Sequence, residues 1–354
     1  MSFAPDSLER YHAAPFDTVI DVRSPSEFAE DRAPGAINLP VLDDAERARV
    51  GTMYVQDSAF RARKMGAALV ARNAARHIEG SLADHEGGWR PLVYCWRGGQ
   101  RSNAFASILE QIGWRVDVLS GGYRRYRDLV KTALYDTPLA ARVVLIDGNT
   151  GTAKTEILHR AAARGVQTID LEGLAHHRGS LFGALGEQPS QKAFESALAE
   201  ILRHLDPTRP VLVEAESSKV GDRNVPPMLW KAMQAAPRIE ISAPLPARAR
   251  YLMRAYADIV ADPDRLEATL TALTRQQGHA RTEGWRKMAH EGRIEALAGD
   301  LMLEHYDPRY AKQREREDRV LLTRLEVEAL DGDALDRLAD RIATVLEAQP
   351  TGSG

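Results

Sequence analysis

The sequence of 354 residues contains a single cysteine, Cys95, and this scarcity narrows the chemistry open to it. One cysteine cannot form an intrachain disulfide, which is typical of proteins in a reducing compartment. No apolar run approaches the roughly 20 residues that a membrane-spanning helix requires. The N-terminal residues also lack a basic start followed by an apolar segment, the pattern of a secretion signal. We therefore expect a cytoplasmic protein that does not cross a membrane.

A large excess of charge of one sign is also missing. Lys and Arg number 47 and Asp and Glu number 50, which gives a formal net charge of −3 with neutral His. This balance argues against a protein that coats nucleic acid nonspecifically. It leaves room for a basic groove on one face, because net charge averages over the whole surface.

Basic residues are nevertheless concentrated in two segments. The first group lies around and after the cysteine and consists of Arg97, Arg101, Arg115, Arg124, Arg125 and Arg127. The second group lies near the C-terminus and consists of Arg309, Lys312, Arg314, Arg316 and Arg319. Acids interleave the second group, so we favour a solvent-exposed helix face with mixed charge pairs there. The first group holds few acids and flanks a reactive side chain, which favours a functional role.

Apolar runs alternate with helical patterns and then restart. The length fits two domains, and 44% hydrophobic and 27% charged residues are typical of a globular protein. The expected strands cover 18–22, 36–39, 91–94 and 115–119, then 142–147, 166–170, 211–214 and 238–241. The alternation predicts an α/β fold with parallel sheets. We place the domains at residues 1–136 and 137–354, and expect mainly helices from about residue 248 onward.

The cysteine follows the predicted strand 91–94 and opens a glycine-rich loop. The loop reads Cys95-Trp96-Arg97-Gly98-Gly99-Gln100-Arg101-Ser102 and leads into a predicted helix, 102–112. Glycines let backbone N–H groups point inward as a nest for an anion. The helix N-terminus, Arg97 and Arg101 would add positive potential and lower the thiol pKa. We therefore predict that Cys95 is a nucleophilic thiolate and not an inert buried side chain.

A second glycine-rich loop follows the continuous apolar strand 142–147. It consists of Gly148, Asn149, Thr150, Gly151, Thr152, Ala153, Lys154 and Thr155. A loop of this kind between a buried strand and a helix is typical of a P-loop, whose N–H groups cradle phosphates. Lys154 would neutralise a phosphate or diphosphate, and the Thr155 hydroxyl could reach Mg²⁺ if a metal is used. Ala153 stands where the pattern has glycine, which leaves the identity of the phosphate ligand open.

Two further groups of side chains are candidates for supporting roles. Glu214 ends a strand of the kind that often faces a P-loop, and Glu216 follows it closely. These two carboxylates could hold a metal or polarise a hydroxyl, or they could equally pair with arginine for structure. His177 and Arg178 could contact a phosphate. Adjacent histidines such as His176 and His177 point in different directions on a helix, so we predict no metal site there.

Three segments in the first domain resemble rhodanese-homology domains. They are residues 21–28, residues 33–40 and Gly121-Gly122-Tyr123, in the order that the family shows. The resemblance implies that Asp21 and Arg23 are structural and that Cys95 is the reactive group. If Arg101 closes the loop, the loop is longer than the six residues of ordinary sulfurtransferases, which favours a bulky acceptor. The chain thus reads as a rhodanese-like domain followed by a P-loop NTPase-like α/β domain with a helical C-terminal region.

From about residue 17 to 256 the chain resembles the tRNA 2-selenouridine synthases. The resemblance rests on this pairing of domains and on residues 50–54, 177–183, 188–195 and 214–221. It implies that the sulfur of a wobble 2-thiouridine in tRNA is alkylated by geranyl diphosphate and that selenophosphate then supplies selenium. The P-loop would hold the diphosphate. Cys95 would carry selenium as a perselenide or guide its attack, and Arg97 and Arg101 would hold selenophosphate or a tRNA phosphate.

The same resemblance implies two co-substrates and no tightly bound cofactor, and leaves Mg²⁺ and the oligomeric state open. Two alternatives remain at this point. One is an ATP-dependent tRNA sulfurtransferase or phosphotransferase with an attached rhodanese domain. The other is a regulatory protein whose cysteine senses redox state and whose P-loop binds a nucleotide. A phosphatase is ranked last.

Overall fold

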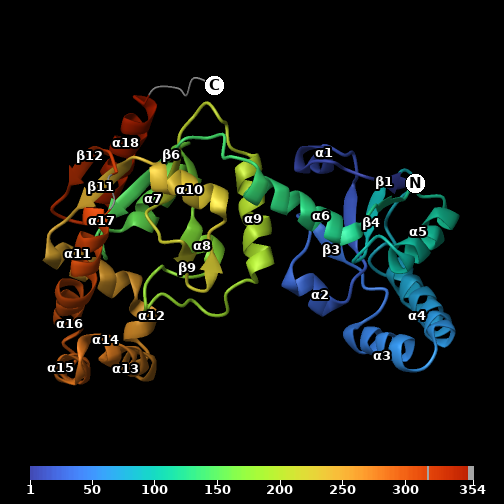
Figure 1. Ribbon diagram of the computed structural model, residues 1–354, viewed down its shortest axis with the longest axis horizontal. Helices are drawn as coiled ribbons and strands as arrows, with labels where there is room; N and C mark the ends of the chain where they lie inside the picture. The colour runs from blue at the N-terminus through green and yellow to red at the C-terminus, as the bar shows by residue number, and fades with distance from the viewer. Residues whose placement is uncertain (317–318, 350–354) are drawn as a thin grey trace. The chain divides into compact units, whose positions relative to one another are not determined.

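The computed structural model describes residues 1–316 and 319–349 and divides them into two compact units (Figure 1). The first unit comprises residues 1–138 together with 189–204, and the second comprises 139–188 and the described residues from 205 onward. Residues 189–204 therefore pack with the first unit, although they lie in the sequence range assigned above to the second domain. The α/β fold class predicted from the alternating pattern is confirmed.

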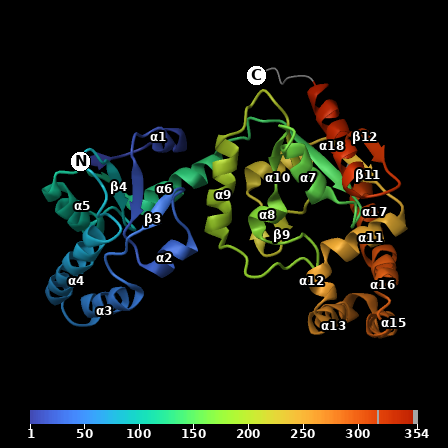
Figure 2. The same cartoon turned by 180° about the vertical axis from the view of Figure 1, so that it is seen from behind.

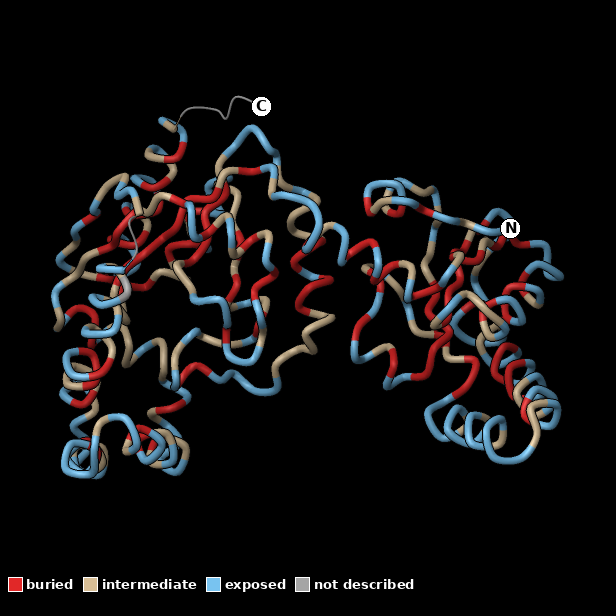
Figure 3. Tube along the Cα trace, viewed as in Figure 1, coloured by how far each residue is buried: buried red, intermediate tan, exposed pale blue. Residues whose placement is uncertain are grey.

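The first unit is built on a parallel sheet of five strands in the order β1-β5-β4-β2-β3. The strands are β1 (Ser2–Phe3), β2 (Thr18–Asp21), β3 (Ala36–Asn38), β4 (Pro91–Tyr94) and β5 (Asp117–Leu119). The helices are α1 (Leu8–His12), α2 (Pro25–Glu30), α3 (Asp44–Gln56), α4 (Ala59–Glu79), α5 (Gln100–Ile112), α6 (Gly122–Lys131), the π-helix η1 (Thr132–Asp136) and α9 (Gln191–Arg203). All four residues of β4 are buried, as expected for a central strand with both faces covered (Figure 3).

A buried ion pair holds the end of β2 in the first unit. Arg23 donates from Nη2 to Asp21 at 2.6 Å and to the Asp31 carbonyl oxygen at 2.7 Å, and both members of the pair are 0% exposed. The guanidinium carbon also lies 3.8 Å from the centre of the Tyr123 ring. These contacts agree with the structural role that the rhodanese resemblance implies for Asp21 and Arg23.

Helix α9 is fixed to the first unit by buried charges. Arg127 on α6 donates to Glu195 on α9 and, at 3.1 Å, to the Ser196 hydroxyl. Ser196 and Tyr123 each donate to the Asp31 carboxylate, at 2.9 and 2.7 Å. Each of these charged groups is buried, so their mutual pairing is what makes the burial tolerable.

The second unit is also built on a parallel sheet of five strands, in the order β12-β11-β6-β8-β7. The strands are β6 (Val143–Gly148), β7 (Gln167–Ile169), β8 (Val211–Glu214), β11 (Arg238–Ser242) and β12 (Leu321–Glu326), with a short antiparallel pair, β9 (Lys219–Val220) and β10 (Arg223–Asn224). The helices are α7 (Lys154–Ala162), α8 (Leu171–Ala175), α10 (Pro227–Ala235), α11 (Leu245–Ala255), α12 (Ala257–Val260), α13 (Pro263–Ala272), α14 (Thr274–Gln277), α15 (His279–His290), α16 (Ile294–Leu301), the π-helix η2 (Met302–Tyr306), α17 (Asp307–Arg316) and α18 (Gly332–Glu347).

Two helices cover one face of this second sheet. Alternate residues such as Val144 and Ile146 of β6 pack with Ile157 of α7 and with Leu335 and Leu338 of α18. Figures 1 and 2 show α7 and α18 side by side over the strands. A separate hydrophobic cluster joins α12, α13, α15 and α16.

The region after residue 248 is mainly helical, as predicted, with one exception. Strand β12 pairs in parallel with β11 at the edge of the sheet, and the sequence analysis did not predict it. Of its six residues only Leu325 is buried, so β12 lacks the continuous apolar run that identified the central strands. Among the described residues no helix is both long enough and apolar enough to cross a membrane.

The buried pair on α9 predicts unequal effects of two substitutions on one helix. Glu195→Ala leaves the Arg127 charge buried without its main partner, and we expect it to lower the free energy of unfolding by about 3 kcal/mol. Lys192→Ala removes an ion pair to Glu30 between half-exposed side chains and should cost less than about 1 kcal/mol. Urea denaturation of both variants measures the difference, and equal losses would contradict this account of α9.

Candidate functional site

The structure places Cys95 immediately after β4, at the carboxyl end of a central strand. Helix α5 begins at Gln100, two residues earlier than predicted, so the turn between strand and helix spans residues 95–99 and Arg101 lies in the first helical turn. Cys95 is only 4% exposed. The thiol is thus held inside the turn.

Hydrogen bonds hold the sulfur in position. The Ser102 hydroxyl lies 3.2 Å from Cys95 Sγ, and the Gly99 N–H donates to the same sulfur at 3.3 Å. Burial acts to raise the pKa of the thiol, but the hydrogen bonds from Ser102 and from the backbone of Arg97 and Gly99 outweigh it and leave the pKa below its ordinary value. A lowered pKa favours the thiolate, which is the nucleophilic form.

We expected the charges of Arg97 and Arg101 to lower the pKa of the Cys95 thiol, but the structure places the two side chains differently. Arg101 donates to Glu27 at 3.0 Å, and Glu27 also pairs with Arg47 at 2.9 Å. Arg97 is exposed. The lowered pKa of Cys95 therefore comes from hydrogen bonds at short range, and Arg101 is held by an ion pair with Glu27 and is not among the causes of the shift. Arg97 remains the loop arginine that faces solvent.

The segment Gly121-Gly122-Tyr123 closes the back of the cysteine turn. The Tyr123 N–H donates to the Cys95 carbonyl oxygen at 2.8 Å. Gly122 has φ +60°, and a Cβ at that position would lie 2.2 Å from the same carbonyl oxygen. Only glycine permits this approach, so the conformation of the cysteine turn depends on the start of α6.

The phosphate loop follows β6 as predicted and opens α7. Ala153, where the P-loop pattern has glycine, adopts the left-handed conformation with φ +61° and is buried. Ala153 thus adopts a conformation that glycine tolerates best, despite its Cβ, and the helix starts at Lys154. Lys154 Nζ donates to the Gly148 carbonyl oxygen at 2.9 Å, across the base of the loop.

Three glutamates gather next to the loop. Thr155 Oγ1 donates to Glu172 at 2.7 Å, and the Glu172 N–H lies 3.4 Å from a Glu214 oxygen. Gly179 has φ +62°, and a Cβ there would lie 2.5 Å from Glu172 and 2.7 Å from Glu216, so glycine lets the chain rest against both carboxylates. Glu172 was not predicted as a site residue, although its place just after β7, beside β8, puts it at the same sheet edge as Glu214.

The charges of this cluster are strongly coupled. Burial and the charge of Glu172 raise the pKa of Glu216 to about 8, and burial raises the pKa of Glu214 well above its ordinary range. Burial acts to lower the pKa of Lys154, but the charges of Tyr310, Glu216 and Glu172 outweigh it and raise the pKa. Lys154 therefore stays protonated while Glu216 is mostly neutral at neutral pH.

Of the three roles considered for Glu214 and Glu216, pairing with arginine finds no support in the described part of the chain, where no ion pair joins either carboxylate to an arginine. Glu214 is 1% exposed, and its Oε1 has no hydrogen-bond partner in residues 1–316 and 319–349. The described residues also contain no group of three or more side chains with the geometry of a metal site.

His177 and Arg178 reach the same cavity as the phosphate loop. The Gly179 N–H donates to His177 Nδ1 at 3.1 Å, and burial lowers the pKa of this histidine. Arg178 pairs with Asp258 at 2.9 Å and lies over the Tyr256 ring. The cavity has a volume of about 610 Å³, and its walls include residues 150–156, Glu172, residues 177–181, residues 215–217, Tyr251, Tyr256, Tyr306, Arg309 and Tyr310.

The expectation of a solvent-exposed face for the C-terminal basic group is wrong for Arg314, whereas Arg309 is exposed as expected. Arg314 donates to Asp147 at 3.2 Å and to the Asn149 side chain at 2.6 Å, which ties α17 to the phosphate loop. Arg309 lines the cavity. On the same helix the Tyr310 ring lies 5.4 Å from Lys154 Nζ. The acids between these basic residues concealed their inward face in the sequence.

The fold and these two sites define a protein with a rhodanese-like thiol site and a P-loop phosphate site. The model of the Rhodanese-like domain matches residues 4–129, and that of the tRNA 2-selenouridine synthase AAA domain matches residues 141–336. A tRNA 2-selenouridine synthase from Cupriavidus necator is 35% identical over 338 residues, covering 86% of this chain and 90% of the relative. One from Chromohalobacter salexigens is 34% identical, with 84% and 88% covered. The chain belongs to the tRNA 2-selenouridine synthase family and is an enzyme.

The hydrogen bonds to Cys95 predict a shift in its reactivity with pH. Ser102→Ala removes one donor to the sulfur, so we expect the pKa of the thiol to rise and the thiolate fraction at neutral pH to fall. The rate of iodoacetamide alkylation against pH measures this pKa, and no other cysteine interferes. Ser107→Ala, an exposed change on the same helix, is the control. An unchanged profile in Ser102→Ala would refute the assignment.

The raised pKa of Glu216 predicts pH-dependent anion binding. Below about pH 8 the side chain is neutral, and above it a negative charge appears beside the phosphate loop and repels an anion. Between about pH 7 and pH 9.5, we expect the affinity for inorganic pyrophosphate to fall about tenfold more in the wild type than in Glu216→Gln. Isothermal titration calorimetry measures both, and parallel pH profiles would show that Glu216 does not face the anion.

Proposed function

We propose that this enzyme replaces the sulfur of wobble 2-thiouridine in tRNA with selenium, by S-geranylation and then selenation. The observation that carries the proposal is that one chain of this family holds both a thiol of lowered pKa and a phosphate-binding loop. A thiocarbonyl sulfur is a poor leaving group, and S-alkylation turns it into a good one. The two sites correspond to the two halves of this chemistry.

In the first half-reaction the thiouridine sulfur attacks C1 of geranyl diphosphate. The C–O bond to the diphosphate breaks, and the proton on the pyrimidine nitrogen is lost. The phosphate loop would receive the diphosphate, with Lys154 balancing its charge and backbone N–H groups of residues 148–155 around it. The Thr155 hydroxyl and Glu172 would support Mg²⁺ if the reaction uses it.

In the second half-reaction the selenium of selenophosphate attacks the activated pyrimidine carbon and geranyl thiolate leaves. Hydrolysis of the P–Se bond then gives 2-selenouridine and phosphate. This route needs no oxidant, because the selenium is already at the selenide level, whereas its transfer to Cys95 as a perselenide would remove two electrons. We therefore favour a Cys95 that guides the attack, with the exposed Arg97 beside it to hold a phosphate.

The experiment separates the two half-reactions in tRNA carrying wobble 2-thiouridine. Mass spectrometry of the nucleosides follows the geranylated and selenated products with geranyl diphosphate, with and without selenophosphate. We expect Lys154→Ala to lower geranylation at least about a hundredfold, because the diphosphate loses its counter-charge in the loop. We expect Cys95→Ala to keep geranylation and lose selenation.

Lys231→Ala, an exposed change in the same unit, is the control and should leave both products unchanged. Full geranylation in Lys154→Ala would remove the phosphate loop from the mechanism, and full selenation in Cys95→Ala would remove the thiol. ATP turnover that depends on tRNA, in place of geranylation, would instead favour the ATP-dependent sulfurtransferase or phosphotransferase.

A further inference from the structure

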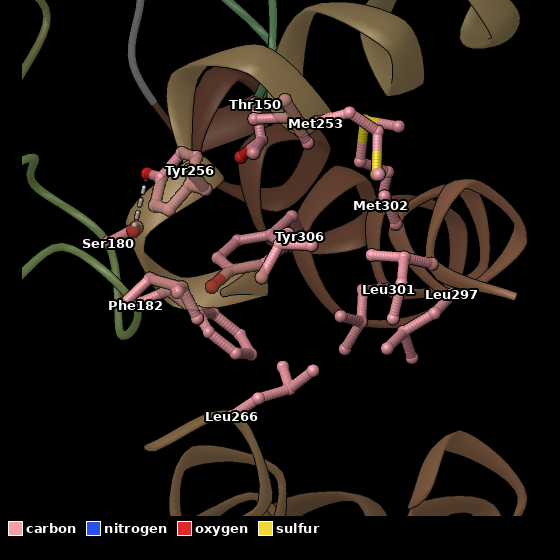
Figure 4. Close-up of a pocket in the computed structure, with 15 residues that line it drawn as sticks. Thr150, Ser180, Phe182, Met253, Tyr256, Leu266, Leu297, Leu301, Met302 and Tyr306 are labelled. Atoms are coloured by element: carbon pink, nitrogen blue, oxygen red, sulfur yellow. Dashed lines mark hydrogen bonds between the residues drawn. The ribbon is translucent and has the colours of Figure 1, made fainter. Parts of the chain in front are cut away.

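An apolar cavity adjoins the phosphate loop in the second unit (Figure 4). Its walls are formed almost entirely by hydrocarbon and thioether side chains, among them Phe182, Met253, Leu266, Leu297, Leu301 and Met302. Thr150, Ser180, Leu252, Tyr256 and Tyr306 line both this cavity and the larger cavity of the phosphate loop. The two cavities therefore meet at the loop, and one ligand can occupy both.

The few polar groups of the apolar cavity lie where the two cavities meet. The Ser180 and Tyr256 hydroxyls lie 2.9 Å apart and satisfy each other (Figure 4). The Tyr306 hydroxyl is buried and has no hydrogen-bond partner in the described part of the chain. A buried hydroxyl without a partner is costly, so its place beside the phosphate loop suits a ligand with a polar head.

The deeper walls offer nothing that a nucleoside base needs. Leu266, Leu297 and Leu301 lie away from Thr150 in Figure 4 and carry no donor or acceptor. The amino group and ring nitrogens of a base would lose their hydrogen bonds to water there without compensation. A hydrocarbon chain meets no such penalty and gains from burial.

We propose that this cavity binds the hydrocarbon chain of a prenyl diphosphate whose diphosphate lies in the phosphate loop, and that Leu266, Leu297 and Leu301 limit the length of that chain. The inference rests on the proposed function and adds the residues that select its alkyl donor. Each methylene buried in such a pocket changes the binding constant by about fourfold. A closed far wall therefore discriminates between donors that differ by one five-carbon unit.

The small volume of the apolar cavity agrees with a strict limit on the length of the hydrocarbon chain. Its volume is about 70 Å³, whereas an engineered protein cavity of roughly 150 Å³ accommodates benzene. A ten-carbon chain therefore requires some side chains to move aside. Met253 and Met302 are unbranched and adapt readily, while Leu266, Leu297 and Leu301 pack in the hydrophobic cluster of α12, α13, α15 and α16. A longer chain would have to displace that cluster.

The test compares geranyl diphosphate with farnesyl diphosphate as donors to tRNA carrying 2-thiouridine. Leu266→Ala opens the far wall, and we expect it to raise the farnesyl-to-geranyl ratio of kcat/KM at least about tenfold. Leu270→Ala is a matched control, because Leu270 lies on the same helix and in the same cluster, is fully buried, and does not line the cavity. It should leave the ratio within about twofold. An unchanged ratio in Leu266→Ala would overturn the proposal.

A second variant tests the proposal by filling the cavity instead of enlarging it. Leu297→Trp fills it, and we expect the affinity for geranyl diphosphate to fall about a hundredfold while the affinity for inorganic pyrophosphate stays unchanged. Thermal unfolding of each variant verifies that it is folded. An equal loss for both ligands, or a change in ADP affinity of the same size, would overturn the assignment of a hydrocarbon chain to this cavity.

Direct binding separates this proposal from the proposed function. If the wild type fails to alkylate tRNA with any prenyl donor, the proposed function fails. The proposal that the cavity binds a hydrocarbon chain is then tested only by the binding affinities that calorimetry measures. A wild type that binds geranyl diphosphate much more tightly than pyrophosphate, with the preference lost in Leu297→Trp, supports the cavity assignment. A wild type that does not distinguish the two ligands overturns it.

Discussion

Parallel strands buried on both faces have their carboxyl ends at one edge of a sheet, and this constraint positions both reactive loops. Cys95 follows β4, a central strand of the first sheet, and Gly148 ends β6, the middle strand of the second. Each loop leads directly into a helix, so its backbone N–H groups converge on a small volume. The sulfur of Cys95 and the N–H groups of the second loop therefore lie where a folded chain most readily stabilises negative charge.

The second site shows how a cation can be held among acids without neutralising all of them. Lys154 lies close to Glu172 and Glu216, and burial raises the pKa of both carboxylates, with the charge of Glu172 raising that of Glu216 further. Arg314 and Arg238 neutralise Asp147 near the end of β6, the strand that leads into the loop. The loop thus remains positive enough to attract an anion while the cluster behind it keeps protons that can be exchanged.

The sequence was sufficient to predict the strands and loops that follow from local patterns. Continuous apolar runs identified the central strands, and the loops after 94 and 147 were found because glycine and the following helix leave a local signature. The edge strand β12 was missed because its alternation is weak, and Arg314 because acids beside it mimic a solvated helix. The Ser102–Cys95 contact depends on the exact residue at which α5 begins, and the position of Glu172 on the packing of β7 beside β8, neither of which a local pattern records.

The path of the chain has a consequence for how the protein can be divided. Helix α9 belongs to the first unit, yet the chain reaches it only after building β6, β7 and the wall of the phosphate cavity. A fragment that ends at residue 136 would therefore lack Glu195 and Ser196, and Arg127 and Asp31 would lose the partners that α9 supplies and keep only their own ion pair at 3.8 Å. The two units are interleaved along the chain, and no single cut yields both of them intact.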